Sequence, residues 1–264
     1  MLIDTHAHLN FKDFDIDRDK IIGQCLNNDV WIINVGVDYK SSKEVIELAE
    51  KHKKGVYASV ALHPHNVGQP DKSASRILTG PPKCPDIVGT FGGLAKHPKV
   101  VAVGECGLDY AFCENDEKTQ KLQQKVFIQH LELAKELNKP VIIHSRRLFP
   151  EILEIVRKHP VKGVLHCYMG RWSYAEEYLK LGFYIGFTGL ITYARDYDKV
   201  IRNAPLDRIL LETDAPYLSP TREKRSTPLD IEKVAQKIAQ IKQISFEKVA
   251  KQTTKNAKEL FKLA

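Results

Sequence analysis

Short apolar runs rich in β-branched residues recur along the whole chain and alternate with segments of helical periodicity. Eight such runs separated by helices are typical of a (β/α)8 TIM barrel, an α/β fold of about 250 residues. We expect strands at Leu2–Asp4, Val30–Val35, Val56–Ala61, Val100–Gly104, Val141–His144, Gly163–Cys167, Phe183–Thr188 and Arg208–Leu211. We expect helices at Ile16–Asn27, Ser42–Lys51, Glu117–Leu137, Phe149–His159, Trp172–Leu181, Asp230–Gln240 and Ser245–Leu263.

The stretch from Asn66 to Pro98 interrupts this alternation, because it is rich in proline and glycine and has no clean periodicity before Ile87. We interpret it as an extended connection between a strand and a helix, with a partial helix over Asp86–Ala95. A doubly wound open sheet would alternate in a similar way, but no glycine-rich phosphate loop supports that fold. We therefore predict a single barrel domain over residues 1–264.

The composition favours a globular cytoplasmic protein with no membrane segment and no obligate protein partner. Hydrophobic residues make up 43% of the 264-residue chain, which is ordinary for a folded domain. Asp4, His6 and His8 stand where a signal peptide would need an apolar core, and no apolar run reaches the length of a membrane span. The five cysteines contain no C-x-x-C pair and suit reduced thiols. The net charge of +7 is compatible with a polyanionic partner but does not establish one.

Histidines and carboxylates stand at the carboxyl ends of the predicted strands, where barrel enzymes build their active sites. His6 and His8 are two apart on the first strand, so their side chains are expected to point to the same side. The other residues of this kind are His63, His65, Glu105, His144, His166, Glu212 and Asp214. Imidazole and carboxylate groups are ligands of Zn, Mn, Fe and Co, and carboxylates also bind Mg. The pattern predicts a metal site.

These ligands fall into two groups when the barrel closes. The first and eighth strands become neighbours and can share one metal, while the fifth and sixth can share another. Glu105, on a central strand between the two groups, is the natural carboxylate bridge between two divalent cations. The first group is His6, His8 and Asp214, and the second is His144 and His166.

Six short motifs occur in order along nearly the whole chain, from Ile3 to the C-terminus. They are Ile3-Asp4-Thr5-His6-Ala7-His8, Leu62-His63-Pro64-His65, Gly104-Glu105-Cys106-Gly107-Leu108-Asp109-Tyr110, Ile143-His144-Ser145-Arg146, Leu165-His166-Cys167-Tyr168 and Leu211-Glu212-Thr213-Asp214-Ala215-Pro216-Tyr217. In this order and spacing, the motifs resemble those of the TatD-related deoxyribonucleases, a family of the metal-dependent amidohydrolase superfamily.

The resemblance implies a (β/α)8 fold, divalent metals (Zn, Mn or Mg) and hydrolysis of DNA, often as an exonuclease acting at 3′ ends. It also implies that His63 is a partner of the substrate phosphate. The metal ligands implied by the resemblance are His6, His8, Glu105, His144, His166 and Asp214.

Two stretches depart from the pattern of the family. Members usually carry a Ser-Gly pair where this chain has Met169-Gly170-Arg171. They also usually carry Arg-Gly-x-x-Asn-Glu-Pro, where this chain reads Arg222-Glu223-Lys224-Arg225-Ser226-Thr227-Pro228. Both stretches are expected to lie on loops that face the substrate, so the departures bear on substrate choice and leave the metal chemistry intact.

The expected mechanism uses a hydroxide activated by two metals, which attacks the phosphorus in line with the leaving sugar oxygen. Asp214 serves as the general base, Glu105 bridges the cations, and His63 contacts a phosphate oxygen or protonates the leaving group. The expected substrate-binding residues are His63, His65, Arg146, Tyr168, Tyr217 and Arg222. Supporting roles are expected for Asp4, Asp109, Tyr110 and the helical residue His130.

Two other classes of function remain open. A small-molecule amidohydrolase, a lactonase or a hydrolase of aminoacyl-tRNA esters could use the same metal centre. Such relatives often carry a carbamylated lysine after the fourth strand, where this chain has Glu105, and this favours the nuclease. A non-catalytic nucleic-acid-binding barrel is the third possibility, but such a protein has no need of six ligands.

Overall fold

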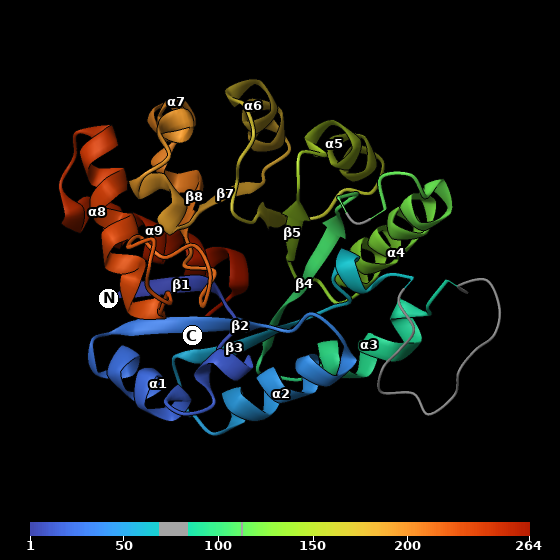
Figure 1. Cartoon of the computed structure of the whole chain (residues 1–264), viewed down its shortest axis with the longest axis horizontal. Helices are drawn as coiled ribbons and strands as arrows, with labels where there is room; N and C mark the ends of the chain where they lie inside the picture. The colour runs from blue at the N-terminus through green and yellow to red at the C-terminus, as the bar shows by residue number, and fades with distance from the viewer. Residues whose placement is uncertain (69–83, 112) are drawn as a thin grey trace.

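The eight strands form one parallel sheet in sequence order, with helices around its outside (Figure 1). This computed structural model describes residues 1–68, 84–111 and 113–264. The strands are β1 Leu2–Ala7, β2 Val30–Val35, β3 Val56–Val60, β4 Val100–Leu108, β5 Val141–Ser145, β6 Gly163–Leu165, β7 Tyr184–Phe187 and β8 Ile209–Leu211. The predicted (β/α)8 barrel is confirmed.

Helices follow the strands and pack against them. They are α1 Arg18–Asn27, α2 Tyr39–Glu50, α3 Ile87–Ala95, α4 Glu117–Glu136, α5 Phe149–Lys158, α6 Trp172–Lys180, α7 Asp198–Asn203, α8 Ile231–Lys242 and α9 Phe246–Phe261. Side chains cap several of them: Asp86 accepts a hydrogen bond from the Gly89 N–H, and Ser245 accepts one from the Lys248 N–H. These bonds satisfy amides that have no partner within a helix, so each cap fixes where its helix begins.

Hydrogen bonds beyond the ends of β8 and β1 bring the sheet round towards closure. The Asp214 N–H donates to the His6 carbonyl at 2.8 Å, and the His8 N–H donates to the Ala215 carbonyl at 2.8 Å. Ala7 and Ala215 form an isolated parallel bridge. The segment that carries Asp214 is therefore fixed beside the segment that carries His6 and His8.

The apolar core has two layers. The inner cluster contains residues of β1, β2 and β4–β8 together with the end of α9, including Ile3, Ile33, Ile142 and Leu210. Strands from opposite sides of the sheet meet in this inner cluster, and no residue of α1–α8 belongs to it. The inner cluster therefore fills the barrel. The outer cluster packs the other face of the strands against the surrounding helices.

Irregularities in two strands turn ligand residues into the barrel. The pairing register shifts between Asp4 and Ala7 in β1 and between Val103 and Cys106 in β4. Such a bulge adds a residue to one strand and reverses the facing of the residues beyond it. Ala7 and Cys106 consequently belong to the outer cluster, and their neighbours His6 and Glu105 face inward.

Several predicted boundaries were wrong in detail. β4 continues to Leu108, so Glu105 lies within the strand and not at its end, and β6 stops at Leu165, before His166. Helix α7 was not predicted, since six residues carry too little periodicity to stand out. The partial helix over Asp86–Ala95 is confirmed as α3, whereas residues 69–83 of the predicted long connection lie outside the described part of the chain. None of the described helices has the length and apolar character needed to cross a membrane.

His130 on α4 is a buried histidine that holds the chain just before His63. Its Nδ1–H donates to the Val126 carbonyl at 2.8 Å, and its Nε2 accepts from the Leu62 N–H at 3.1 Å. Burial lowers the pKa of His130 to about 4. The prediction of a structural role for this residue agrees with these contacts.

The lowered pKa of His130 predicts a loss of stability in acid. Unfolded chains take up a proton on this histidine below about pH 6.5, whereas the folded protein resists it until about pH 4. His130 therefore contributes stability above pH 6.5 that is lost as the pH falls towards 4, to a total of about 3 kcal/mol. Urea unfolding at several pH values should show His130→Gln approaching the wild type as the pH falls. His159→Gln, which alters a histidine whose side chain has no hydrogen bond within the described residues, should run parallel to the wild type. If His130→Gln also runs parallel to it, this account is wrong.

Candidate metal centre

His6 and His8 face each other where β1 ends. Their Nε2 atoms lie 3.2 Å apart. The Nδ1 of His8 lies 2.8 Å from the Val35 carbonyl, which can only accept, so His8 donates from Nδ1 and keeps a lone pair on Nε2. The Nδ1 of His6 is buried with no hydrogen-bond partner in the described part of the protein. Protein groups alone therefore do not satisfy this pair of imidazoles.

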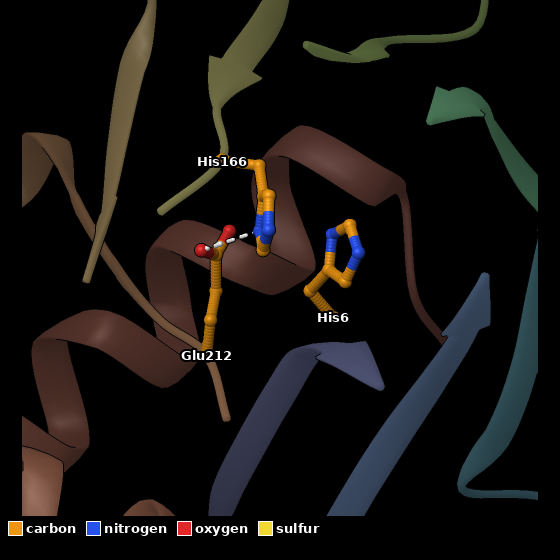
Figure 2. A group of neighbouring side chains, drawn as sticks. All are labelled: His6, His166 and Glu212. Atoms are coloured by element: carbon orange, nitrogen blue, oxygen red, sulfur yellow. Dashed lines mark hydrogen bonds and ion pairs between the residues drawn. The ribbon is translucent and has the colours of Figure 1, made fainter. Parts of the chain in front are cut away.

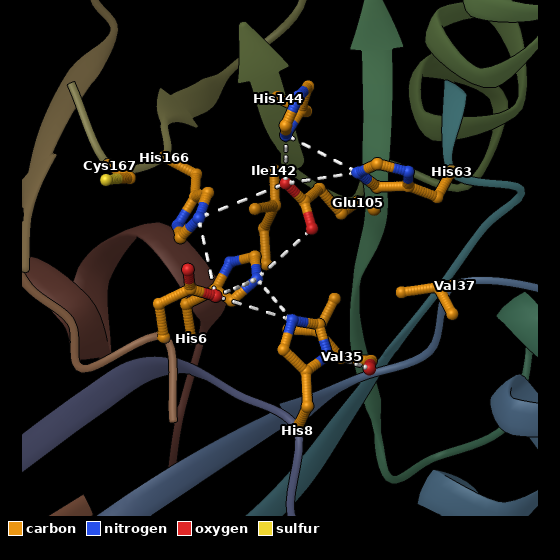
Figure 3. Close-up of polar contacts among 12 residues, drawn as sticks. His6, His8, Val35, Val37, His63, Glu105, Ile142, His144, His166 and Cys167 are labelled. Atoms are coloured by element: carbon orange, nitrogen blue, oxygen red, sulfur yellow. Dashed lines mark hydrogen bonds and ion pairs between the residues drawn. The ribbon is translucent and has the colours of Figure 1, made fainter. Parts of the chain in front are cut away.

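Glu105 lies between two sets of imidazoles (Figure 3). Its Oε2 is 3.3 Å from Nε2 of His6. Its Oε1 is 2.7 Å from Nδ1 of His144, 3.7 Å from Nε2 of His63 and 3.9 Å from Nε2 of His166. Each carboxylate oxygen thus faces a different group of nitrogens, which is the geometry a bridging carboxylate requires.

Asp214 completes the side of the site nearest His6 and His8. Its Oδ1 lies 3.5 Å from Nε2 of His8, 3.8 Å from Nε2 of His6 and 3.7 Å from Nε2 of His166. Asp214 adopts a left-handed backbone conformation with φ 57°, which aspartate tolerates better than most residues. Such conformations gather at functional sites, where the surrounding structure enforces them.

His166 is held between His6 and Glu212. The rings of His6 and His166 stack with centroids 3.5 Å apart, and Glu212 accepts a hydrogen bond from Nδ1 of His166 at 2.9 Å (Figure 2). The same carboxylate oxygen accepts from the Cys167 N–H at 2.8 Å. Gly186 makes room for this buried carboxylate, since a Cβ there would lie 2.2 Å from Glu212 Oε1. Glu212 therefore fixes the tautomer of His166 and leaves Nε2 free for the site.

Asp109 holds His144 in a corresponding way. Its Oδ2 accepts from Nε2 of His144 at 3.1 Å and from Nε2 of His65 at 2.6 Å. His144 then presents Nδ1 to Glu105. Asp109 was expected only to support the loop, and its contact with a predicted ligand was missed because Asp109 and His144 meet only when β4 and β5 pair.

Asp4 lies beneath the site and connects β1 to the end of β8. Its carboxylate accepts hydrogen bonds from the hydroxyl and the N–H of Thr213 and from the N–H of His6. Burial raises the pKa of Asp4 to about 8 in spite of these bonds. Within the described part of the chain, the hydrogen bonds of this carboxyl group go to Thr213 and His6, as expected of a supporting residue.

The field in the site favours positive charge on two of the imidazoles. Burial opposes charge on His144, but hydrogen bonds to Asp109 and Glu105 raise its pKa to about 9. Burial likewise opposes charge on His166, but Glu212 and Glu105 raise its pKa to about 10. The pKa of Glu105 lies well below its ordinary value, because the neighbouring imidazoles outweigh the effect of its burial. A cation would gain from the same field.

The donor atoms fit divalent metal ions. His6, His8 and Glu105 place one ligand atom each within 4.8 Å of one another, and so do His63, Glu105 and His144. Glu105 is common to both groups. Converging imidazole nitrogens and a shared carboxylate are the donor set of Zn, Mn and related metals.

The residues predicted to bind substrate lie in different environments. Arg146 is half exposed, with Nε 3.8 Å from Oδ2 of Asp109, and Arg222 lies over the Tyr193 ring at 4.4 Å. Tyr217 is 54% exposed. Tyr168, by contrast, is only 2% exposed, and its hydroxyl donates to the Arg171 carbonyl, so its ring packs in the core.

Comparisons with known proteins identify the relatives of this chain. The sequence model of the family described as TatD related DNase matches residues 3–262. The chain is 35% identical over 272 residues to the Bacillus subtilis uncharacterized metal-dependent hydrolase YabD, with all of both chains covered. It is 31% identical over 264 residues to human deoxyribonuclease TATDN3, covering 98% of this chain and 94% of that protein. The solved structure of YJJV, a TatD homolog from Escherichia coli, has a TM-score of 0.86 at 28% identity and covers 100% and 98% of the two chains.

The fold and the converging ligands define a metal-dependent hydrolase of the barrel class. The chain belongs to the TatD-related DNase family. The resemblance carried by the six motifs is thereby confirmed.

Glu212→Gln should weaken metal binding about 10- to 100-fold, because the neutral amide no longer raises the basicity of His166. Titration of the metal-free protein against a chromophoric chelator measures this affinity. Glu154→Gln, an exposed glutamate on α5, is the matched control and should bind metal as the wild type does. Equal affinity in the two variants would remove Glu212 from this role.

Proposed function

We propose that this chain is a deoxyribonuclease that hydrolyses phosphodiester bonds of single-stranded DNA from the 3′ end, using two divalent cations. The observation that carries the proposal is the sharing of Glu105 by two groups of imidazole nitrogens. The name of the human relative, a deoxyribonuclease, supports DNA as the substrate. The net charge of +7 is compatible with a polyanion.

The residues that would hold the metals are His6, His8, Glu105, His144, His166 and Asp214. His63 joins the second group, since its Nε2 is 3.7 Å from Glu105 Oε1 and 3.4 Å from Nδ1 of His144. Bound divalent cations lower the pKa of water and neutralise charge that grows on the phosphoryl oxygens.

The side chains of the protein supply the proton transfers and the orientation of the substrate. Asp214 accepts the proton of the attacking water, since its carboxylate is partly buried beside His8 and its pKa is lowered, so that it is ionised at neutral pH. His63 has its pKa lowered to about 4 by burial, so it stays neutral. A neutral His63 can ligate a cation or donate one hydrogen bond to a phosphate oxygen. Arg146 and Arg222 are exposed and can pair with neighbouring phosphates.

The direct test uses protein stripped with a chelator and reloaded separately with manganese, zinc or magnesium. Single-stranded DNA labelled at the 5′ end should shorten progressively, while the 3′ label should be released at once. An ester and a lactone panel are run in parallel. Ester or lactone turnover without loss of DNA would replace the nuclease with a small-molecule hydrolase.

A further inference from the structure

Two aromatic rings lie beside the metal centre and belong to neither core layer. Phe11 follows β1 and Tyr217 follows β8, and we call this pair the aromatic shelf. The Phe11 ring stacks on the imidazole of His8, with centroids 4.6 Å apart and planes 12° apart. Tyr217 meets Phe11 edge to face at 6.3 Å. The shelf therefore continues outward from a candidate metal ligand.

Backbone hydrogen bonds hold both rings in register with the metal centre. The Phe11 N–H donates to the His8 carbonyl at 3.0 Å, and the Tyr217 N–H donates to the Asp214 carbonyl at 2.8 Å. The Arg18 guanidinium donates to the Phe11 carbonyl at 3.1 Å and also to the carbonyls of the two preceding residues. A surface that is fixed in this way loses little conformational entropy when a ligand packs on it.

Packing within the protein does not explain why the two rings of the shelf are exposed. Tyr217 is 54% exposed, and its hydroxyl has no hydrogen bond to any described residue. Phe11 is partly exposed, whereas nearby Phe14 is fully buried beneath the guanidinium of Arg225. An exposed ring fixed beside a phosphodiester site is the feature that proteins use to stack the bases of single-stranded nucleic acid.

Arg18, whose guanidinium contacts the Phe11 carbonyl, is already paired with Asp15 at 2.7 Å, which favours a neutral group over a phosphate beside the shelf. Cationic Arg146 follows β5, on the opposite side of the barrel from β1. Phosphates would therefore be drawn to the metals and to Arg146, and the uncharged base is left for the shelf.

We propose that Phe11 and Tyr217 form a stacking site for the nucleobase of a nucleotide adjoining the scissile phosphate. The proposal rests on the proposed function, because it needs a phosphodiester held at the metal centre. The shelf stacks a base without reading its identity, since every base has a π-face. The enzyme should accordingly act on all four terminal nucleotides but discriminate against a terminus that lacks bases.

The test compares kcat/KM for two single-stranded oligonucleotides. One is unmodified, and the other carries abasic residues at the last two positions of both ends, so the direction of digestion does not matter. The variants are Phe11→Leu and Tyr217→Leu, which remove the ring and keep apolar volume. The matched controls are Phe11→Tyr and Tyr217→Phe, which keep it. Metal content is measured for each protein, and the Tyr217 variants leave the ring against His8 untouched.

The wild type and both ring-retaining controls should prefer the unmodified oligonucleotide by about tenfold. Phe11→Leu and Tyr217→Leu should lose this preference, because their cleavage of the unmodified strand should fall to the rate of the abasic strand. If the leucine variants keep the preference, or the wild type shows none, the stacking site is wrong while the nuclease assignment stands. If the metal-loaded wild type cleaves neither strand, the nuclease assignment itself fails.

Discussion

Replacing Glu105 with alanine should lower kcat/KM for DNA by at least about a thousandfold and reduce the bound metal. The two carboxylate oxygens face different imidazole groups, at 3.3 Å from His6 and 2.7 Å from His144. Loss of this side chain removes a ligand from both groups at once. It also removes the negative charge that offsets the positive charge of the bound cations. Metal analysis after exhaustive dialysis and cleavage of end-labelled DNA measure the two effects.

The matched control is Glu154→Ala, which removes an exposed glutamate of α5 and should keep both metal and activity. Glu105→Gln keeps the shape of the side chain, so it separates the loss of charge from the loss of volume. Near-normal cleavage by Glu105→Ala, at unchanged metal content, would show that Glu105 does not bridge the metals.

Asp214→Asn is expected to lower kcat by about a hundredfold to ten-thousandfold while much of the bound metal remains. An amide oxygen can still contact a cation, but it cannot accept the proton of an attacking water. Burial opposes ionisation of Asp214, yet the nearby imidazoles of His166, His6 and His8 lower its pKa. Rate measurements from pH 5 to 9, at saturating metal, separate kcat from KM.

Asp207→Asn serves as the control, because Asp207 is exposed and precedes β8 at the other end of the barrel. It should match the wild type in kcat, KM and metal content. If Asp214→Asn loses its activity only through lost metal, and added metal restores the full rate, then Asp214 is a ligand without a role in proton transfer.

The strands and most helices could be predicted because a strand that is buried on both faces consists mostly of apolar residues. The run Val30–Val35 is apolar except for Asn34, and the observed β2 has the same bounds. The positions of His63 and Asp214 after strands also follow from the sequence alone. The end of β4 could not be predicted, since Glu105 and Gly107 interrupt an apolar pattern while the pairing with β5 continues.

Tertiary structure decided how the ligands and their partners meet. Glu212 and His166 are 46 residues apart, and only the packing of β6 to β8 brings them within hydrogen-bond distance. Tyr168 is buried because its ring packs against Phe149, a contact that no local sequence pattern predicts. Strict alternation of side chains along a strand would assign a residue beyond a register shift to the wrong face of the sheet.

The sequence by itself determined the alternation of strands and helices and the chemical identity of the ligands, because burial and donor type are properties of each residue. Only the tertiary structure decided that His6 and Glu105 turn inward, since the register shifts in β1 and β4 arise from pairing with neighbouring strands. It likewise decided that Phe11 lies on His8 and meets Tyr217, because closure of the sheet joins segments from the two ends of the barrel.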